Sequence, residues 1–155
     1  MLIKNAQQIK DILTEFQDAL PILKTSEEYR ESMAEKFSRY AYFLVLQSNN
    51  ENSGFCAFYA NDSNTKTAYI SFIAVADKFR GQHFGKQILE KVISISKETG
   101  MEFIKLEVLK TNIIAQNFYI RNGFKILENA SDKSIYMIKS IMAVENNATF
   151  VETVK

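Results

Sequence analysis

The sequence has no tryptophan, one proline, one cysteine and 5 glycines, and none of its apolar runs approaches the length of a membrane-spanning helix. A single thiol cannot close a disulfide within the chain, and metal sites usually need more soft ligands than this sequence supplies. Lysine and arginine total 19 against 18 aspartate and glutamate residues, so the net charge of +1 gives no electrostatic basis for binding nucleic acid or a membrane surface. We therefore expect no metal, no nucleic acid and no membrane among its partners.

Hydrophobic residues make up 46% and aromatic residues 12% of the 155 positions, which excludes a disordered or low-complexity chain. The length suits one domain over residues 1–155. The first residues, Met1 to Gln8, carry no apolar core of signal-peptide length, and we expect a soluble cytoplasmic protein. Residues 143–155 fit either a frayed end or a strand that pairs with a second copy in a homodimer.

Apolar spacing predicts the order of helices and strands. Residues spaced three and four apart from Ala6 to Leu20 indicate a helix that Pro21 ends, and a second helix begins near Ser26. The expected strands are residues 40–46, 54–60, 67–75, 103–109, 124–127 and 134–141, and the later helices run from residue 84 to Gly100 and over residues 112–122. This order predicts a mixed α/β fold, with one sheet and helices on its faces.

The segment from Val75 to Lys86 joins a buried strand to a helix through a turn that contains two glycines. Backbone amides in such a turn converge with the unpaired amides of the helix's first turn, so the turn can hold an anion. Gly81 and Gly85 leave room for a phosphate against the backbone, and Arg80 and Lys86 supply cations at the rim. The spacing matches neither a Walker loop nor the dinucleotide fingerprint. A tight turn with solvated cations is the alternative.

A second segment, residues 112–124, follows the next strand and predicts a helix that Asn112 caps. At 3.6 residues per turn, Asn112, Ala115 and Tyr119 share one face, so an amide, a small side chain and a phenol line one side of the same crevice. The small Ala115 leaves room for a ligand along that face. An amphipathic helix with a polar cap and a glycine stop is the other interpretation.

Together the two segments resemble the coenzyme A site of the GNAT superfamily of N-acetyltransferases. The family's first motif, Q/R-x-x-G-x-G/A, reads Arg80 to Gly85 here. Its later signature, N-x-x-A-x-x-F/L-Y-x-x-x-G-F, is matched at every position from Asn112 to Phe124. The one departure is His83, which stands where the family usually has its first glycine. Histidine is among the residues that tolerate a left-handed backbone, and its ring is either exposed at a permissive turn or directed at a phosphate.

The resemblance covers roughly Met1 to Ile141 and implies a mostly antiparallel central sheet with helices on both faces. It implies that the sheet splays between the strands at residues 67–75 and 103–109. Acetyl-CoA would be the cosubstrate, with its pantetheine arm in the gap and its diphosphate on the glycine-containing turn. The cofactor-binding residues that the resemblance implies are Ile73, Ala74, Val75, Arg80, Gly81, Gln82, His83, Phe84, Gly85, Lys86, Asn112, Ala115 and Tyr119.

By the same resemblance, the amine of a small molecule or peptide attacks the thioester directly, and an acid protonates the departing thiolate. Tyr119 is the candidate acid, with simple packing as the alternative. Glu107 is the candidate base. Its neighbours Leu106 and Val108 suggest that it is partly buried, which would tune its proton affinity, unless it faces solvent instead. A protein of this fold that binds acyl-CoA without catalysis, as a sensor or partner, is the alternative function.

The acceptor pocket is expected between the two N-terminal helices, the link over residues 20–25 and a hairpin tip near residues 49–53, with Tyr69 and Ser71 on one strand face. Cys56 lies in an apolar run, so we expect a buried small hydrophobic residue there. A nucleophilic Cys56 would need His83 as its base, because the sequence has no other histidine.

Overall fold

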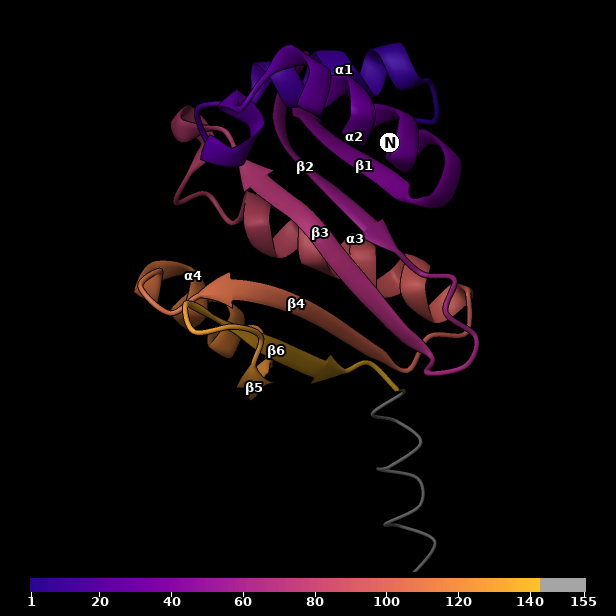
Figure 1. Cartoon of the computed structure of the whole chain (residues 1–155), viewed down its shortest axis with the longest axis vertical. Helices are drawn as coiled ribbons and strands as arrows, with labels where there is room; N and C mark the ends of the chain where they lie inside the picture. Colours follow the sequence, from indigo (N-terminus) through magenta and orange to yellow (C-terminus); the bar gives the residue numbers. More distant parts are fainter. Residues whose placement is uncertain (143–155) are drawn as a thin grey trace, which may run out of the picture.

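A computed structural model describes residues 1–142, so the predicted frayed end or dimer strand over residues 143–155 lies outside the described residues. The described chain forms a six-stranded sheet in the order β1-β2-β3-β4-β6-β5, with helices on both faces (Figure 1). Its elements are α1 (Ala6–Glu15), η1 (Pro21–Lys24), α2 (Glu27–Tyr40), β1 (Tyr42–Ser48), β2 (Glu51–Tyr59), β3 (Thr67–Val75), η2 (Asp77–Phe79), α3 (Phe84–Glu98), β4 (Phe103–Leu109), α4 (Ile113–Arg121), β5 (Lys125–Asn129) and β6 (Ser134–Ser140). Only β3 and β4 pair in parallel, so the predicted mixed, mostly antiparallel sheet is confirmed.

Local side-chain chemistry sets where the N-terminal helices begin and end. Asn5 and Ser26 each accept a hydrogen bond at 2.9 Å from the backbone N–H three residues further on, so they cap α1 and α2. The first helix ends at Glu15, earlier than the apolar spacing predicted. Leu20 stands before Pro21 and adopts an extended backbone with φ of −130°, because the proline ring excludes the helical conformation from its predecessor.

The hairpin between β1 and β2 is tighter than the sequence suggested. Asn49 and Asn50 have φ of +52° and +65°, which is the left-handed pair that a two-residue hairpin turn requires. Asparagine tolerates this region better than most residues, so Ser48 pairs directly with Glu51. The second strand therefore begins at residue 51 rather than at residue 54.

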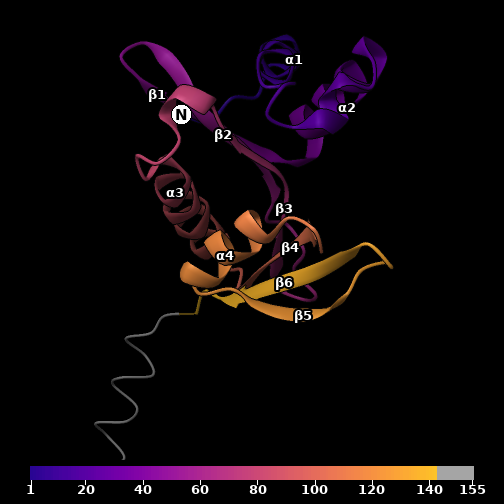
Figure 2. The same ribbon diagram turned by 90° about the vertical axis from the view of Figure 1, so that its left-hand side faces the viewer.

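The sheet separates two hydrophobic cores. One core packs α3 and α4 against residues of all the central strands, and the other packs α1 and α2 against β1, β2 and the end of β3 (Figure 2). Phe37, Phe43 and Phe55 are completely buried in the second core, and burial of each ring contributes about 2–3 kcal/mol. A Cβ atom at Gly54 would lie 2.8 Å from Ile88 Cδ1, so glycine at this position permits the close packing of α3 on β2.

The parallel pair at the centre of the sheet is joined over a short length only. Three residue pairs connect β3 with β4, and the last of them is Tyr69 with Lys105. Beyond this pair the strands separate towards their carboxyl ends (Figure 1). The register between β2 and β3 skips Ser71, which is the extra residue of a β-bulge, and a bulge bends a strand away from its neighbour. The predicted splayed strand pair is confirmed.

Candidate active site

The gap between the separated strands opens into a cleft of about 1140 Å³. Its walls are the last residues of β3 and β4, the turn that leads into α3, and the face of α4 that begins at Asn112. Both strands end at this cleft, and the carboxyl ends of diverging strands are the usual ligand site in open α/β sheets.

Across the described residues, none of the helices has the length and apolar character needed to cross a bilayer.

The edge of β3 that borders the cleft offers backbone groups for pairing. The N–H of Ala76 donates to Ser53 O on β2 at 2.9 Å. Successive residues of a strand direct their N–H and C=O groups to opposite edges, so the backbone groups of Val75 and Ile73 point away from β2 and into the cleft. Val75 O accepts a hydrogen bond from Arg80 Nε at 3.3 Å, which agrees with this direction. An extended ligand with amide groups can therefore add to β3 as a strand would.

The turn before α3 has the backbone of an anion site. Gly81 has φ of +77° and His83 has φ of +66°, so both residues are left-handed. His83 is the N-cap residue of α3 and makes no side-chain cap, which leaves the first amides of the helix free for a ligand. The left-handed conformation at His83 explains why the family usually has glycine there, and histidine is one of the residues that adopt it.

Charged side chains stand at the rim of this turn. Arg80 Nη1 lies 2.9 Å from Asp77 Oδ1, and both side chains are largely exposed, so the pair is open to exchange with a bound phosphate. Lys86 also lines the cleft. Gln82 is the exception among the residues predicted to bind the coenzyme, because it is not part of the cleft wall and its Nε2 donates to Lys78 O at 3.2 Å.

The N-terminus of α3 approaches α4 closely because residue 85 is a glycine. A Cβ atom at Gly85 would lie 3.0 Å from Cζ of Phe118, which is tighter than ordinary packing. The approach brings the anion turn and α4 to the same cleft, as the resemblance implied. The predicted residues that line this cleft are Ile73, Ala74, Val75, Arg80, Gly81, His83, Phe84, Gly85, Lys86, Glu107, Asn112, Ala115 and Tyr119.

Tyr119 presents a phenol to the cleft from a mostly apolar surrounding. Its ring meets Phe118 and Phe124 edge-on, with centroids 5.3 and 5.5 Å away. Burial, and to a smaller extent the neighbouring Cys56, raises the pKa of Tyr119 well above its usual range. The phenol therefore keeps its proton at neutral pH and is available as a donor. Asn112 Oδ1 accepts from the N–H of Ala115 at 3.1 Å and fixes the start of this helix.

Cys56 is completely buried beneath the same cleft, in the core between the sheet and α3. Burial raises the pKa of its thiol far above the usual value, so the reactive thiolate form is strongly disfavoured. The prediction of a buried hydrophobic residue is confirmed.

Glu107 lies on the exposed face of β4, so of the two positions that the sequence left open for this side chain it takes the solvent-facing one. Side chains alternate along a strand, and it is Leu106 and Val108 that point into the core below α3. Glu107 Oε2 accepts a hydrogen bond from Ser134 Oγ at 2.5 Å. Burial, followed by the charge of Glu107, raises the pKa of Tyr69.

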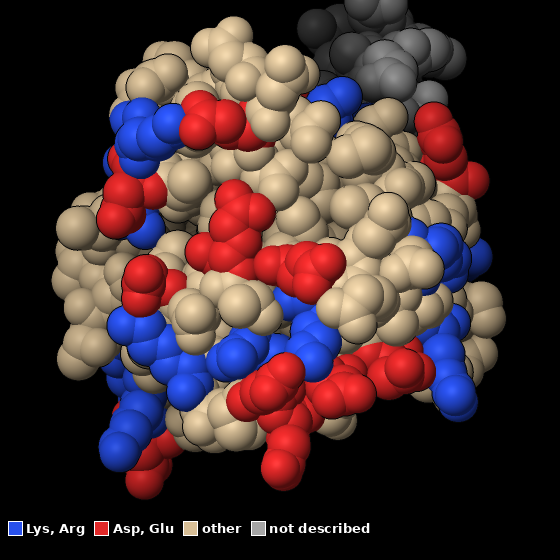
Figure 3. Space-filling view, turned by 90° about the horizontal axis from the view of Figure 1, so that it is seen from above, with Lys and Arg blue, Asp and Glu red and all other residues tan. Residues whose placement is uncertain are grey.

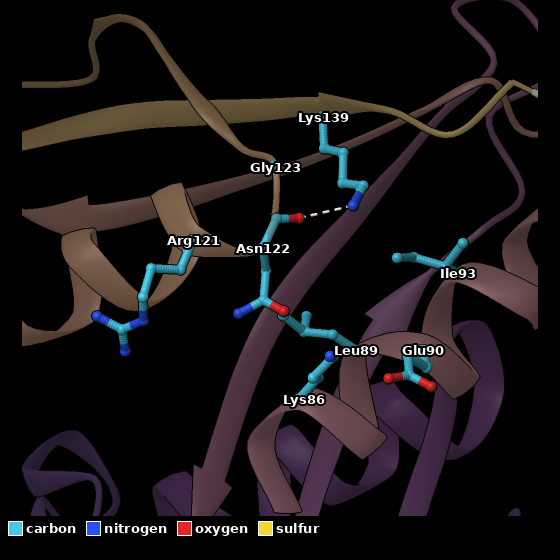
Figure 4. A pocket seen from close by; sticks show the side chains of 8 residues that line it. All are labelled: Lys86, Leu89, Glu90, Ile93, Arg121, Asn122, Gly123 and Lys139. Atoms are coloured by element: carbon cyan, nitrogen blue, oxygen red, sulfur yellow. Dashed lines mark hydrogen bonds between the residues drawn. The ribbon is translucent and has the colours of Figure 1, made fainter. Parts of the chain in front are cut away.

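A smaller hollow of about 370 Å³ lies between α3 and the end of α4 (Figure 4). Three cations line it, Lys86, Arg121 and Lys139, together with Glu90. Lys139 Nζ donates to Asn122 O at 2.6 Å, which satisfies a carbonyl group at the end of α4. Lys86, Arg121 and Asn122 also line the cleft, so the hollow lies beside it.

The structure adds cleft residues that the sequence analysis did not single out. The link between α1 and α2 contributes Ala19, Leu20 and Ile22, in agreement with the predicted wall from residues 20–25, whereas the hairpin tip at residues 49–53 takes no part. Leu109 and Ile114 are exposed apolar residues on the opposite wall. Within residues 1–142, no three His, Cys, Asp or Glu side chains gather as metal ligands would.

Comparison with known proteins identifies the family. The profile of the acetyltransferase (GNAT) family matches residues 9–124, three quarters of the chain, so this protein belongs to that family. The suspected resemblance is therefore confirmed, and the family motifs at residues 80–85 and 112–124 border the cleft described above.

Individual relatives share part of the sequence or the fold. A Bacillus subtilis protein provisionally described as a ribosomal protein bS18 alanine N-acetyltransferase is 28% identical over 86 residues, which cover 56% of this chain and 55% of the relative. The chain thus spans about half the length of that curated relative. A Bacillus anthracis structure provisionally described as a streptothricin acetyltransferase, in complex with acetyl-CoA, is 26% identical with a TM-score of 0.61, over 68% of this chain and 66% of that one. An acetyltransferase structure from Thermus thermophilus shares the fold, with a TM-score of 0.76 at 13% identity, over 90% of this chain and 96% of that one.

Proposed function

We propose that this protein transfers the acetyl group of acetyl-CoA to a primary amine. The observation that carries the proposal is one cleft that combines a free strand edge, a turn rich in unpaired amides and the protonated phenol of Tyr119. Membership of the acetyltransferase family supports it, as does the acetyl-CoA bound by the Bacillus anthracis relative. We place the reaction in the cytoplasm, where acetyl-CoA is available.

The coenzyme fits the cleft through three kinds of contact. The amides of its pantetheine arm would pair with the backbone of Ile73 and Val75, as an added strand. Its diphosphate would lie on the amides of residues 81–85, where the helix dipole of α3 favours negative charge. Arg80 would exchange Asp77 for a phosphate oxygen, and a bidentate contact of this kind is stronger than an exposed ion pair.

The reaction then follows from the groups that face the thioester. The nitrogen of the free amine attacks the carbonyl carbon, a C–N bond forms, and the tetrahedral oxyanion would be stabilised by backbone N–H groups of β3 beyond its bulge at Ser71. The C–S bond breaks as the intermediate collapses, and the departing thiolate takes the proton of Tyr119. The acetylated nitrogen then gives its extra proton to the Tyr119 phenolate, directly or through water, which restores the phenol and leaves a neutral amide. The amine is an ammonium ion in solution and must lose a proton before it attacks.

Glu107 is the group that we assign to this first proton transfer. It is the one carboxylate among the described residues of the cleft wall. Ser134 occupies its Oε2 atom, so Oε1 remains free to accept a proton from the ammonium ion, directly or through water. Its exposed position supplies the route by which that proton returns to solvent.

Replacement of Tyr119 with phenylalanine tests the proposal. The change keeps the ring that packs on Phe118 and Phe124, so we expect a stable protein with an unchanged Kd for acetyl-CoA and a kcat lower by roughly a hundredfold. Calorimetry and a free-thiol assay with an amine panel provide the two measurements. Tyr59→Phe is the matched control, because that hydroxyl is buried without a described hydrogen-bond partner and lies outside the cleft wall. An unchanged kcat in Tyr119→Phe would remove the acid from the mechanism.

A further inference from the structure

We infer that the acceptor is a primary amine with a single positive charge and an apolar group beside the amine, not a polyamine or amino sugar with several ammonium groups. The inference rests on the proposed function and names the substrate class of the same cleft. Two features of the acceptor side carry it: the number of carboxylates in the wall and the apolar residues that border the opening.

The acceptor side is the face of the sheet that carries Glu107. Along β4, Leu106 and Val108 belong to the core under α3, so Glu107 and Leu109 point to the opposite face. Phe72 of β3 contacts the core of α1 and α2, which lies on that same opposite face. An amine that reaches the gap from this side meets Glu107, while the coenzyme approaches along α3 and α4.

One carboxylate can neutralise one ammonium group. Among residues 1–142, Glu107 is the only Asp or Glu side chain in the cleft wall. Additional ammonium groups would leave water without a partner of opposite charge, which is unfavourable in a cleft with mostly apolar walls. A polycationic acceptor therefore finds no electrostatic complement here.

Three acidic residues of the N-terminal helices and the link between them are paired with lysines. Asp18, before η1, lies 2.8 Å from Lys24 Nζ. On α2, Glu27 and Glu31 lie 2.9 and 3.8 Å from Lys10 Nζ, and none of these acids lines the cleft. Seen from above, acidic and basic side chains are interspersed over this face of the molecule (Figure 3).

Apolar side chains border the opening from both sides of the gap. Ile22 of η1 is 50% exposed and Leu109 at the end of β4 is 54% exposed, and both line the cleft together with Leu20. The two elements belong to opposite walls, since the N-terminal helices cover the side of β3 and Leu109 ends β4 (Figure 1). Large exposed apolar residues at a cleft indicate that a ligand covers them. An apolar side chain next to the reacting amine would do so.

The test compares kcat/KM for leucinamide, glycinamide, a peptide with an amino-terminal leucine, and spermidine, each with saturating acetyl-CoA. We expect kcat/KM for leucinamide to exceed those for glycinamide and spermidine by roughly tenfold or more. Ile22→Ser and Leu109→Ser should each raise the KM for leucinamide more than the KM for glycinamide, and so remove most of the advantage of leucinamide. Ile120→Ser is the matched control, because Ile120 is 51% exposed on α4 and does not line the cleft.

Each outcome bears on a separate claim. Preference for spermidine, or equal effects of Ile120→Ser and Leu109→Ser, would overturn the acceptor class while the acetyl transfer itself stands. Absence of turnover with every amine, despite measurable acetyl-CoA binding, would overturn the proposed function and the acceptor class together. A peptide that outperforms leucinamide supports the inference and identifies a protein amino terminus as the source of the amine, whereas equal values support it with a small molecule.

Discussion

The hydroxyl group of Ser134 ties the carboxylate of Glu107 to the turn between β5 and β6. Ser134 Oγ lies 2.5 Å from Glu107 Oε2 and 2.9 Å from Ser131 Oγ. A hydroxyl group has one proton, and the carboxylate can only accept, so Ser131 must be the donor in the second bond. The chain of bonds fixes one carboxylate oxygen and leaves the other without a described partner. In the proposed reaction Ser134 would therefore position Glu107.

Replacement of Ser134 with alanine should lower kcat by roughly tenfold and leave the KM for acetyl-CoA unchanged, because a hydrogen bond to a charged group is lost. Ser134→Thr keeps the hydroxyl and should restore most of the activity. Ser140→Ala is the control, since Ser140 lies exposed at the other end of β6. In a Glu107→Gln background, Ser134→Ala should have little further effect on kcat. An equal loss in both backgrounds would show that Ser134 does not act through Glu107.

Single residues also show how far sequence reasoning reaches. The two family motifs contain many of the residues that line the cleft, because the anion turn and the face of α4 are each continuous in sequence. The exposure of Glu107 could not be predicted with the same reasoning. A strand such as β4 alternates between two faces, and nothing in its own residues tells whether α1 and α2 reach across to cover the second face.

At the scale of elements, two asparagine caps offer a matched pair. Asn112 Oδ1 accepts from a backbone N–H at 3.1 Å at the start of α4, and Asn5 does the same at 2.9 Å at the start of α1. Either residue replaced by alanine should lower the free energy of unfolding by about 1 kcal/mol, measured by urea denaturation. Only Asn112 lines the cleft, so Asn112→Ala alone should weaken acetyl-CoA binding in calorimetry. Equal Kd values for the two variants would contradict the position assigned to the coenzyme.

Element boundaries were predicted best where burial is strong. The strands at residues 67–75 and 103–109 have the predicted bounds: apolar residues run through the first almost without interruption, and in the second they alternate with Lys105 and Glu107. The hairpin and the end of α1 differ by several residues, since they depend on the left-handed tolerance of two asparagines and on the constraint that Pro21 places on Leu20. The bulge at Ser71 left no signal in the sequence, because a bulge is defined by the register of the partner strand.

The whole molecule should become less stable in alkaline solution. Burial raises the pKa of both Cys56 and Tyr119 above the ordinary values of 9.0 and 10.0. In the unfolded chain these groups lose their protons near the ordinary values, whereas in the folded protein they keep them. The contribution of these two neutral groups to the free energy of unfolding is therefore complete below about pH 8. As the pH rises further, each group lowers the free energy of unfolding by about 1.4 kcal/mol per pH unit.

Urea denaturation between about pH 7 and pH 10.5 measures this loss. Cys56→Ala removes the group that titrates first, so its free energy of unfolding should fall less steeply above about pH 9 than that of the unchanged protein. The alanine leaves a small cavity, which lowers the curve at all pH values without changing its slope. Identical slopes for the two proteins would contradict the assignment of a neutral, buried thiol.

The overall topology was predictable from the order of helices and strands and from the resemblance, whereas the proposed acceptor side was predictable only in part, through the link over residues 20–25. That side combines Leu20 and Ile22 with Leu109, which are more than eighty positions apart in the sequence. No local pattern marks them as neighbours, because exposed apolar residues occur singly on most protein surfaces. Their common role becomes visible only when the sheet opens between β3 and β4.

The short contact between β3 and β4 has a mechanical consequence. With three residue pairs across that line, little backbone ties the first half of the sheet to the second. A pantetheine arm hydrogen-bonded to Val75 and Ile73 would bridge β3 and β4 where the two strands do not pair with each other. Bound acetyl-CoA would then make the protein more rigid and more stable than the free protein. In a cell, both properties would increase with the concentration of acetyl-CoA.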